Sequence, residues 1–544
     1  MRHHSYNENL PGKILYLFSI LLSLLMILKV FSGLNEQQIY VYFNSDTLYL
    51  PSIFRDLFVD HSGFSGWHLN GAPNFFPDML LYFIINTVFF NFRVAMIIFS
   101  ILQYGILLIL IRRLFRTIFP GIREEELAAG NLIMLVFFLV TLYPGDFVFT
   151  FYLLSISYHM GAFLMALLAM VFTFRFLKSG HRSDLFFLFL TGLSGVINDK
   201  LFIAMYVLPA LSLILFLPSV NYRKRIILVL SNTLLVVLLG TIIYNGIRHS
   251  GTIHIISLSW KFLNFANIPV SFHTMIHQHL TYIKSLDFRS LTVILSILSF
   301  LVTTWFAVIY FVRFYRNKNV DVRDLFTAIY LVFSAFFWII VLATPVINGS
   351  YVGYAILRYN IYAFYLSLFN LSVILMLIRR NMKLRHTGWI ISGSLTLLLI
   401  LPLAVRHSGI SSGGLKNLVH YYPAMVRKMD TLSSREDLHY GVASYWNAKY
   451  ITMFSQTGLR VYTVYEDLNP WYHVMNENWY HRGGKGKYGN PAFTFVYMEA
   501  LDSARVAQKL GNPLKVIPFR ESSVHVYQPF YFDDRGKPVL INAP

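Results

Sequence analysis

The chain of 544 residues contains no cysteine, so disulfide bonds, thiolate metal sites and cysteine nucleophiles are excluded. Charged residues make up only 13% of it, about half the share that soluble domains carry. Acidic side chains are the scarcer kind, with 26 Asp and Glu against 45 Lys and Arg and a formal net charge of +19. The basic residues form short clusters between apolar runs rather than one soluble face. This arrangement argues against a nucleic-acid partner and for a protein whose solvent is lipid.

Apolar and aromatic residues dominate the rest of the sequence. Hydrophobic residues make up 56% of the chain, and 49 Phe and 35 Tyr contribute to an aromatic share of 17%. A helix needs about 20 mostly apolar residues to cross roughly 30 Å of hydrocarbon. We therefore predict an all-α polytopic membrane bundle of about eleven crossings, with thirteen as the alternative. The predicted crossings are residues 14–31, 94–111, 127–143, 158–174, 185–197, 201–217, 226–243, 291–312, 325–342, 356–378 and 389–405.

Two apolar runs need separate interpretation. The run at 14–31 could pass for a signal peptide, but it is rather long and lacks an A-x-A-like cleavage site, so we expect a retained signal anchor. The run at 78–92 is short for a crossing. We expect it to lie along the membrane interface or to pack against the bundle from outside.

Lys and Arg in short loops predict the orientation, because short loops that are rich in these residues stay in the cytoplasm. The loops at 144–157 and 343–355 contain neither residue. With a cytoplasmic N-terminus, the cytoplasmic loops hold Arg112, Arg113, Arg116 and Arg123; Arg175, Lys178 and Arg182; Arg223, Lys224 and Arg225; Arg313, Arg316, Lys318 and Arg323; and Arg379, Arg380, Lys383 and Arg385. The pattern predicts a multi-pass protein of a bacterial inner membrane whose C-terminal part lies in the periplasm.

We expect a transmembrane domain at 1–405 and an extracytoplasmic soluble domain at 406–544. Within the first, the loop at 32–93 is far longer than a connector needs, and long loops are usually functional. In the second, FTFVYME, LKVIPF and SSVHVYQPF are typical of strands and DSARVAQKLG of a helix. The tail is therefore predicted to form a small α/β domain.

Asp46 is the first candidate for chemistry. It lies in FNSDTLYLPSIFRDLF, just before a stretch in which Leu50, Ile53, Phe54 and Leu57 share one helical face, as in helices that lie in the membrane interface. A carboxylate held there could take the proton of an acceptor hydroxyl as a general base. The alternative is a helix cap, since Asp before a helix accepts hydrogen bonds from free backbone N–H groups.

The loop continues with GWHLNGAPNFFPDMLLYF. Its order of an Asp, a W-x-L-N-G-x-P segment and a Pro-led aromatic helix resembles the GT-C glycosyltransferases of the protein O-mannosyltransferase and lipid A aminoarabinose transferase type. The resemblance implies that Asp46 is the catalytic aspartate. The other matching positions are Tyr49, Asn70, Gly71, Pro73, Leu80 and Tyr82. Thr47 replaces the family's Glu, and Phe76, Pro77 and Asp78 replace its acidic and Lys positions, which suggests a distant branch with a different substrate.

A second match is ILRYNIYAFYL, with Arg358 and Tyr359 at the expected outer end of a late crossing. The resemblance implies that the Arg of this pair holds the phosphate of the lipid donor. Independently, a guanidinium suits a phosphate because it gives paired charge-assisted hydrogen bonds. The alternative is an Arg whose charged end reaches the interface beside an interfacial Tyr.

Further candidates are three polar sites with ordinary alternatives. Asp78 could be a second carboxylate near the site or the cap of the helix after Pro77. Asp146, in the YPGDF turn, could contact an acceptor, but Pro-Gly-Asp is also common in turns. Asp199 and Lys200, which follow Asn198, could bind sugar or phosphate or form the tip of a helical hairpin.

Histidines and tail aromatics are weaker candidates. The candidate histidines are His159, His254, His273, His277 and His279. The last three have an H-x-x-x-H-x-H spacing without a carboxylate partner, so we predict no metal site for them. A divalent cation remains an alternative as a cofactor. The segments WNAK (446–449) and NPWYHVMNENWY (469–480) could form a glycan surface or an aromatic core.

The predicted function is transfer of a sugar from a polyprenyl-phosphate donor to an acceptor on the outer face of the membrane. Asp46 would be the base, and Arg358 would stabilise the departing phosphate, with both groups facing one cavity. The acceptor could be a glycan, a glycolipid or a protein, and membrane lipids surround the bundle. The alternatives are a transporter or flippase of a lipid-linked sugar and a non-catalytic membrane subunit of the same fold. No Gly-rich phosphate loop follows a strand, which argues against a nucleotide-sugar donor.

Overall fold

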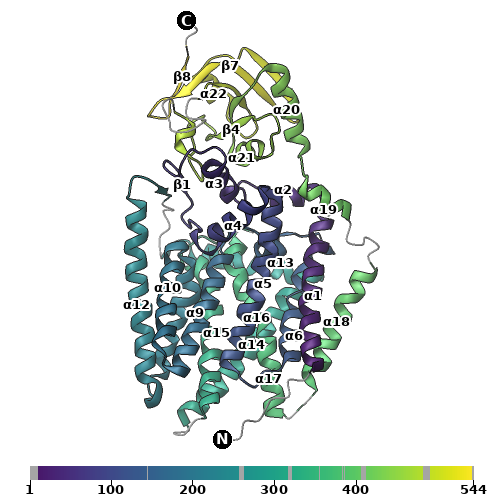
Figure 1. Ribbon diagram of the computed structural model, residues 1–544, viewed down its shortest axis with the longest axis vertical. Coiled ribbons are helices and arrows are strands. Elements are labelled where there is room, and N and C mark those ends of the chain that lie inside the picture. Colours follow the sequence, from purple (N-terminus) through teal and green to yellow (C-terminus); the bar gives the residue numbers. More distant parts are fainter. Residues whose placement is uncertain are drawn as a thin grey trace. The chain divides into compact units, whose positions relative to one another are not determined.

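The computed structural model describes residues 10–143, 145–256, 263–316, 321–353, 356–382, 384, 386–405, 412–481 and 491–541. Contacts divide the chain into two compact units (Figure 1). The helical unit comprises Met1–Leu34, Ile97–Ile243 and Ser259–Leu415. The sheet unit comprises Asn35–Met96, Tyr244–Leu258 and Lys416–Pro544. The first loop, predicted as part of the transmembrane domain at 1–405, therefore groups with the C-terminal part of the chain.

Eight helical segments are long and apolar enough to cross a membrane among the described residues. Two of the eight are continuous pairs of helices, α6 with α7 and α16 with α17. Within the bundle, α1 packs against α6, and α14 packs against α15. The eight are α1 (Leu10–Gly33), α5 (Phe92–Ile118), α6 (Glu124–Ile133) with α7 (Val136–Leu142), α9 (Met160–Ser179), α12 (Val220–Arg248), α14 (Phe288–Arg316), α15 (Val322–Ile347), and α16 (Leu357–Phe369) with α17 (Leu371–Met382). The chain is thus a mostly helical membrane protein.

The other three predicted crossings coincide with shorter segments. Residues 185–197 lie in α10 (Arg182–Asn198), which has 17 residues. The run 201–217 is divided into η2 (Ile203–Val207), α11 (Leu208–Ala210) and η3 (Leu211–Phe216), and Pro209, which has no N–H to donate, lies at the break. The run 389–405 lies in α18 (Thr387–Val405), of which Thr387–Ile400 form a shorter apolar helix. Eight crossings are supported by length, and the number eleven stays a prediction.

Buried acidic residues pair with several of the basic residues that predicted the orientation. Glu124, Glu125 and Glu126 form the first turn of α6, where negative charge is favoured by the helix dipole. Glu124 lies 2.8 Å from Arg112, and Glu126 lies 2.6 Å from Arg379. These pairs gather charge at one end of the bundle. Lys318, Lys383 and Arg385 lie outside the described residues.

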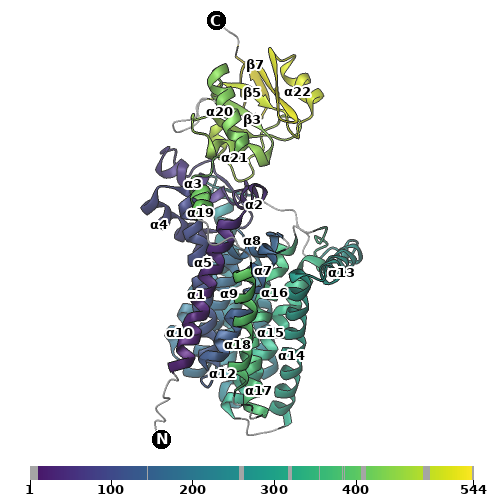
Figure 2. The same ribbon diagram turned by 90° about the vertical axis from the view of Figure 1, so that its right-hand side faces the viewer.

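The C-terminal part of the sheet unit is a mixed six-stranded sheet with the order β4-β3-β5-β7-β6, in which β8 also pairs with β7. The pairings of β3 with β4 and β5 are parallel, and those of β7 with β5, β6 and β8 are antiparallel. Figure 2 shows α20 and α22 flanking the strands. The elements are α19 (Ser412–Val419), α20 (Ala424–Glu436), β3 (Tyr440–Ala443), α21 (Tyr445–Phe454), β4 (Arg460–Thr463), β5 (Phe493–Tyr497), α22 (Ser503–Leu510), β6 (Lys515–Phe519), β7 (Ser522–Phe532) and β8 (Pro538–Leu540). The strands and helix expected at β5, β6, β7 and α22 are confirmed.

The first loop contributes short elements to the same unit. They are α2 (Glu36–Tyr42), α3 (Tyr49–Phe58), β1 (His68–Leu69), η1 (Phe75–Met79) and α4 (Leu80–Phe89). With ten residues, α4 is too short to span a bilayer, which agrees with the interpretation of the run 78–92. β1 pairs in parallel with β2 (His254–Ile255), so two loops far apart in sequence meet in this unit.

Candidate functional site

Asp46 lies in the turn between α2 and α3. The side-chain oxygen of Asn44 accepts hydrogen bonds from the backbone N–H groups of Asp46 at 2.9 Å and Thr47 at 3.0 Å, and so shapes this turn. Leu48 is the N-cap of α3, and no side-chain cap bond occurs there. The capping role that competed with the catalytic one is therefore not the role that Asp46 has. Its half-buried carboxylate is directed by other contacts.

Helix α21 holds the Asp46 turn. The Tyr445 hydroxyl donates a hydrogen bond to Oδ1 of Asp46. The Ser45 hydroxyl donates to the backbone carbonyl of Tyr445 at 2.7 Å, and the Lys449 ammonium group donates to the carbonyl of Ser45 at 3.2 Å. Tyr445 and Lys449 are four residues apart, so they share one face of the helix. One helical face thus fixes both the position of the turn and the direction of the carboxylate.

Lys449 is unusual for a lysine because it is only 2% exposed. Its Nζ also donates to the carbonyl of Val474 at 2.9 Å. Burial lowers the pKa of Lys449 to about 7, and the negative charge of Asp46 opposes this shift. Near neutral pH the side chain can therefore lose its charge and still donate hydrogen bonds as an amine.

The lowered pKa of Lys449 predicts a pH dependence of stability. Between about pH 7 and pH 10.5 the unfolded chain carries a proton on Lys449 that the folded chain lacks, so the free energy of unfolding should rise with pH. Below pH 7 both states are protonated and this contribution becomes constant. The melting temperature of the sheet unit should therefore rise from pH 7 to pH 9. In Lys449→Met this dependence on pH should be weaker. An equal slope in the variant would contradict the assignment to Lys449.

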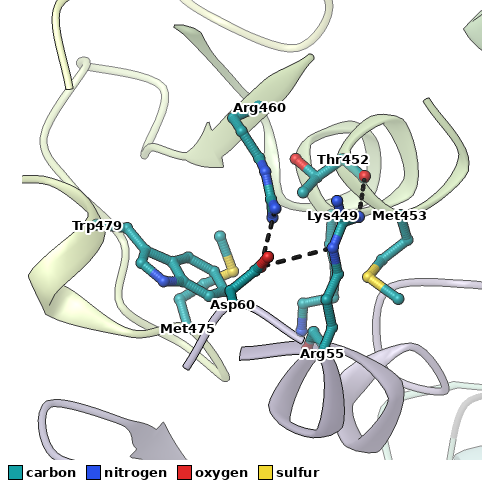
Figure 3. A pocket seen from close by; sticks show the side chains of 9 residues that line it. Arg55, Asp60, Lys449, Thr452, Met453, Arg460, Met475 and Trp479 are labelled. Atoms are coloured by element: carbon teal, nitrogen blue, oxygen red, sulfur yellow. Dashed lines mark hydrogen bonds and ion pairs between the residues drawn. The ribbon is translucent and has the colours of Figure 1, made fainter. Parts of the chain in front are cut away.

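A buried ion pair lies beside Lys449 (Figure 3). Arg460 donates to Asp60 at 2.8 Å, and the side chains of both are 4% exposed. Nε of Arg55 lies 3.6 Å from Asp60, and Nη1 of Arg55 donates to the carbonyl of Thr452 at 3.0 Å. Breaking a buried pair leaves an uncompensated charge, so such contacts fix the local arrangement. Here they join α3 and the loop after it to α21 and β4.

Asp56 strengthens the same junction. Its carboxylate accepts hydrogen bonds from Nε1 of Trp67 at 2.8 Å, Nδ2 of Asn476 at 2.7 Å and Nε1 of Trp479 at 3.1 Å. Burial raises the pKa of Asp56, and these three donors oppose the shift. The Trp of the W-x-L-N-G-x-P segment therefore has a defined structural role, anchoring the first loop to the tail.

Three side chains in the sheet unit could hold a metal ion. His68, His254 and Glu477 place one potential ligand atom each within 4.8 Å of one another. Nε2 of His68 lies 2.9 Å from Oε2 of Glu477, and the two imidazole rings stack with centroids 4.5 Å apart. The hydrogen bond from His68 lowers the pKa of Glu477. Two imidazoles and a carboxylate are a common ligand set for Zn²⁺ in proteins.

The predicted H-x-x-x-H-x-H set is not assembled in this way. The rings of His273 and His277 stack with centroids 6.3 Å apart, whereas Nδ1 of His279 lies 2.7 Å from the carbonyl of Met275. His254 was grouped with these residues from the sequence, but its partners come from β1 and from the tail. No spacing signal could reveal a group drawn from three distant segments.

Zinc binding at His68, His254 and Glu477 should be measurable. We expect Zn²⁺ to raise the melting temperature of the purified full chain and a chelator to lower it, because a ligand that binds only the folded state stabilises it. His68→Ala should remove the response. His439→Ala, which changes a largely exposed histidine of the same unit, should keep it. A melting temperature insensitive to Zn²⁺ and chelator would leave the three residues as an ion pair with a stacked ring.

The helical unit brings together several other predicted residues. The guanidinium of Arg358 lies 4.9 Å from the ring centre of Tyr359. The ring centres of His159 and Tyr359 are 4.7 Å apart. Nδ1 of His159 lies 2.6 Å from Oδ2 of Asp199, whose other oxygen accepts from the backbone N–H of Leu201 at 2.9 Å. The sequence had selected Tyr359 and Asp199 separately, and His159, one of the weaker candidates, is the residue that links them. The guanidinium of Arg358 and the imidazole of His159 therefore both lie close to the Tyr359 ring.

The remaining candidates have different settings. Asp146 caps the backbone N–H of Val148 at 3.0 Å and lies 3.8 Å from Arg289, which supports the ordinary turn role. Lys200 is exposed beside Asp199. Asp78 is fully buried in η1, and no side chain caps α4.

The N-G-x-P segment lies in the sheet unit with Asp46. The hydroxyl of Tyr49 donates to the carbonyl of Pro73 at 3.2 Å, and that of Tyr244 donates to the carbonyl of Gly71 at 2.9 Å. Asn70 is partly exposed. The candidate residues therefore form two groups, one with Asp46 in the sheet unit and one with Arg358 in the helical unit.

No protein-family model matches this chain, and no curated protein is significantly similar to it.

Proposed function

We propose that this protein is an integral-membrane glycosyltransferase that moves a sugar from a polyprenyl-phosphate carrier to an acceptor hydroxyl outside the cytoplasm. The observation that carries the proposal is the Asp46 carboxylate, which does not cap α3 and is instead oriented by Tyr445. A base must keep a fixed direction toward the proton that it takes. The likeness of the surrounding loop to GT-C enzymes supports the same role.

The proposed transfer uses two groups of the chain, the Asp46 carboxylate and the Arg358 guanidinium. The acceptor oxygen forms a bond to the anomeric carbon of the sugar while the bond from that carbon to the phosphate oxygen breaks. The acceptor proton goes to Asp46, and the bonding electrons leave with the phosphate. The products are a glycoside and the polyprenyl phosphate, and no oxidant or nucleotide is consumed.

The group around Arg358 supports the donor end of the proposal. A guanidinium stabilises the charge that builds up on a departing phosphate, an electrostatic contribution that is often the largest in catalysis. His159, held by Asp199, can donate from its other ring nitrogen to a second phosphate oxygen. Asn70, Asp78 and Lys200 are proposed substrate-binding residues on the strength of the sequence alone, whereas Asp146 is better explained by its turn contacts.

Orientation and location are part of the proposal. A cytoplasmic N-terminus in a bacterial inner membrane would put the sheet unit in the periplasm, where carrier lipids rather than nucleotides present sugars. The basic loops support this orientation. The acceptor would be a cell-envelope glycan, a glycolipid or a protein.

Reconstituted protein tests the function directly. With a radiolabelled polyprenyl-phosphate sugar in vesicles and a crude cell-envelope fraction as acceptor, we expect label to leave the polyprenyl carrier and polyprenyl phosphate to appear in equal amount. Label that changes leaflet but stays on the lipid would indicate a flippase instead. Label that neither moves nor transfers would favour a non-catalytic subunit.

A further inference from the structure

A cavity of about 460 Å³ opens in the sheet unit beside the Asp46 turn. This size falls within the range of about 300–1,000 Å³ that is usual for small-molecule sites. Three parts of the chain line it: the end of α2 with the Asp46 turn, the start of α21, and the residues after β5. Its polar and aromatic lining residues are Tyr40, Asn44, Ser444, Trp446, Asn447 and Glu499.

The aromatic part of the lining reaches the candidate base. Trp446 is 49% exposed, although large aromatic residues are normally mostly buried. Its ring lies 4.9 Å from that of Tyr445, whose hydroxyl donates to Asp46. On its other side Tyr445 contacts Trp471, with ring centres 5.0 Å apart. A ring system therefore leads from the cavity to the carboxylate.

The polar part of the lining selects a chemical class. The amide nitrogen of Asn447 donates to the Ser444 hydroxyl at 3.0 Å, and Glu499 accepts from Tyr497. Amides, a hydroxyl and a carboxylate offer both donors and acceptors, as a polyhydroxyl ligand requires. The lining holds one carboxylate and no Lys or Arg, so no cation of the lining itself would pair with an anionic ligand. An alkyl chain would use none of the remaining hydrogen-bonding capacity of the amide and carboxylate groups.

We propose that this cavity binds a neutral saccharide unit of the acceptor, with Trp446 stacking on the sugar and Asn44, Asn447 and Glu499 taking its hydroxyls. The inference rests on the proposed function in one respect, because it makes a sugar hydroxyl the group that Asp46 deprotonates. It names the acceptor as a neutral glycan rather than a phosphorylated lipid or a polypeptide. Saccharide binding itself needs neither the donor nor catalysis.

The test is binding of the full detergent-solubilised chain to an array of immobilised oligosaccharides. The array holds neutral glycans, phosphorylated glycans and a Ser/Thr-rich peptide. We expect binding to a subset of the neutral glycans. Trp446→Ala should weaken it roughly ten-fold or more, the loss expected when one large aromatic contact is removed. Trp305→Ala, which removes an equally large and 66% exposed ring on α14, should bind as the wild type does.

Two further variants separate the outcomes. Asp46→Asn should keep glycan binding, because the base is not needed to hold the sugar, and Glu499→Gln should weaken binding while leaving the unit folded. Binding to phosphorylated glycans or to the peptide in preference to neutral glycans, or neutral-glycan binding unaffected by Trp446→Ala and Glu499→Gln, would overturn the saccharide site. Absence of binding anywhere on the array would also overturn it. Glycan binding that depends on Trp446 in a chain that transfers no label would instead overturn the glycosyltransferase proposal alone.

Discussion

Asp46→Asn is expected to lower kcat for sugar transfer by about 10²- to 10⁴-fold, the contribution usual for a general base. The amide cannot take the acceptor proton, but its oxygen can still accept the hydrogen bond from Tyr445. The turn should therefore keep its shape, since Asn44 and Lys449 hold it through the backbone and through Ser45. Initial rates with saturating donor would measure the effect.

The matched control is Asp437→Asn, because the Asp437 side chain is 93% exposed in the same unit. It should transfer at the wild-type rate. An Asp46→Asn protein with wild-type melting behaviour and wild-type kcat would remove Asp46 as the base. The contacts of Asp46 would then be purely structural.

Arg358→Gln is expected to lower kcat/KM by about 10²- to 10³-fold, the loss typical when a group that stabilises transition-state charge is removed. Arg358→Lys should recover only part of it, because an ammonium group is a point charge and cannot give the paired hydrogen bonds of a guanidinium. The order wild type, Lys, Gln therefore distinguishes phosphate binding from a simple need for charge. The measurement is the donor dependence of the transfer rate.

Arg182→Gln, at an exposed position at the start of α10, serves as the control for loss of one positive charge. We expect it to behave like the wild type. If the Arg358 side chain only reaches the membrane interface beside Tyr359, both Arg358 variants would retain donor affinity. That result would contradict the donor-site assignment.

The sequence predicted the long helices because their signal is local. A run of about 20 apolar residues must be helical to satisfy its backbone in lipid, and the described part of the chain contains eight such segments. The run 201–217 forms the shorter helical segment Ile203–Phe216, whose hydrogen-bond pattern changes from η2 through α11 to η3 around Pro209. Local chemistry decides both outcomes.

The sheet was predicted only where its strands were long enough to show a pattern. β7 has 11 residues, and apolar and polar residues alternate at 524–526, whereas β5 has five residues and is recognisable by its aromatic and β-branched content. β3 and β4 have four residues each and are buried throughout or nearly so, so they show no alternation. Their parallel pairing through α21 depends on packing that no short window of sequence reports.

The candidate site was predictable in part for the same reason. Asp46 and Asn70 lie in one loop with a recognisable order, whereas Tyr445, which orients Asp46, lies 399 residues further along the chain. The group of His68, His254 and Glu477 is likewise drawn from three segments. His159 was visible as a residue, but its contacts with Asp199 and Tyr359 were not.

The proposed function requires Asp46 and Arg358 to serve one carrier-lipid headgroup. A polyprenyl phosphate with a photoreactive group on its first isoprene unit, irradiated with the wild-type chain in vesicles, tests it most directly. We predict that mass spectrometry will find the crosslinks in peptides of both 40–49 and 357–362, and that unlabelled polyprenyl-phosphate sugar will compete them away. Crosslinks confined to one of these segments, or found in the basic loops at 112–123 and 379–385, would contradict the account.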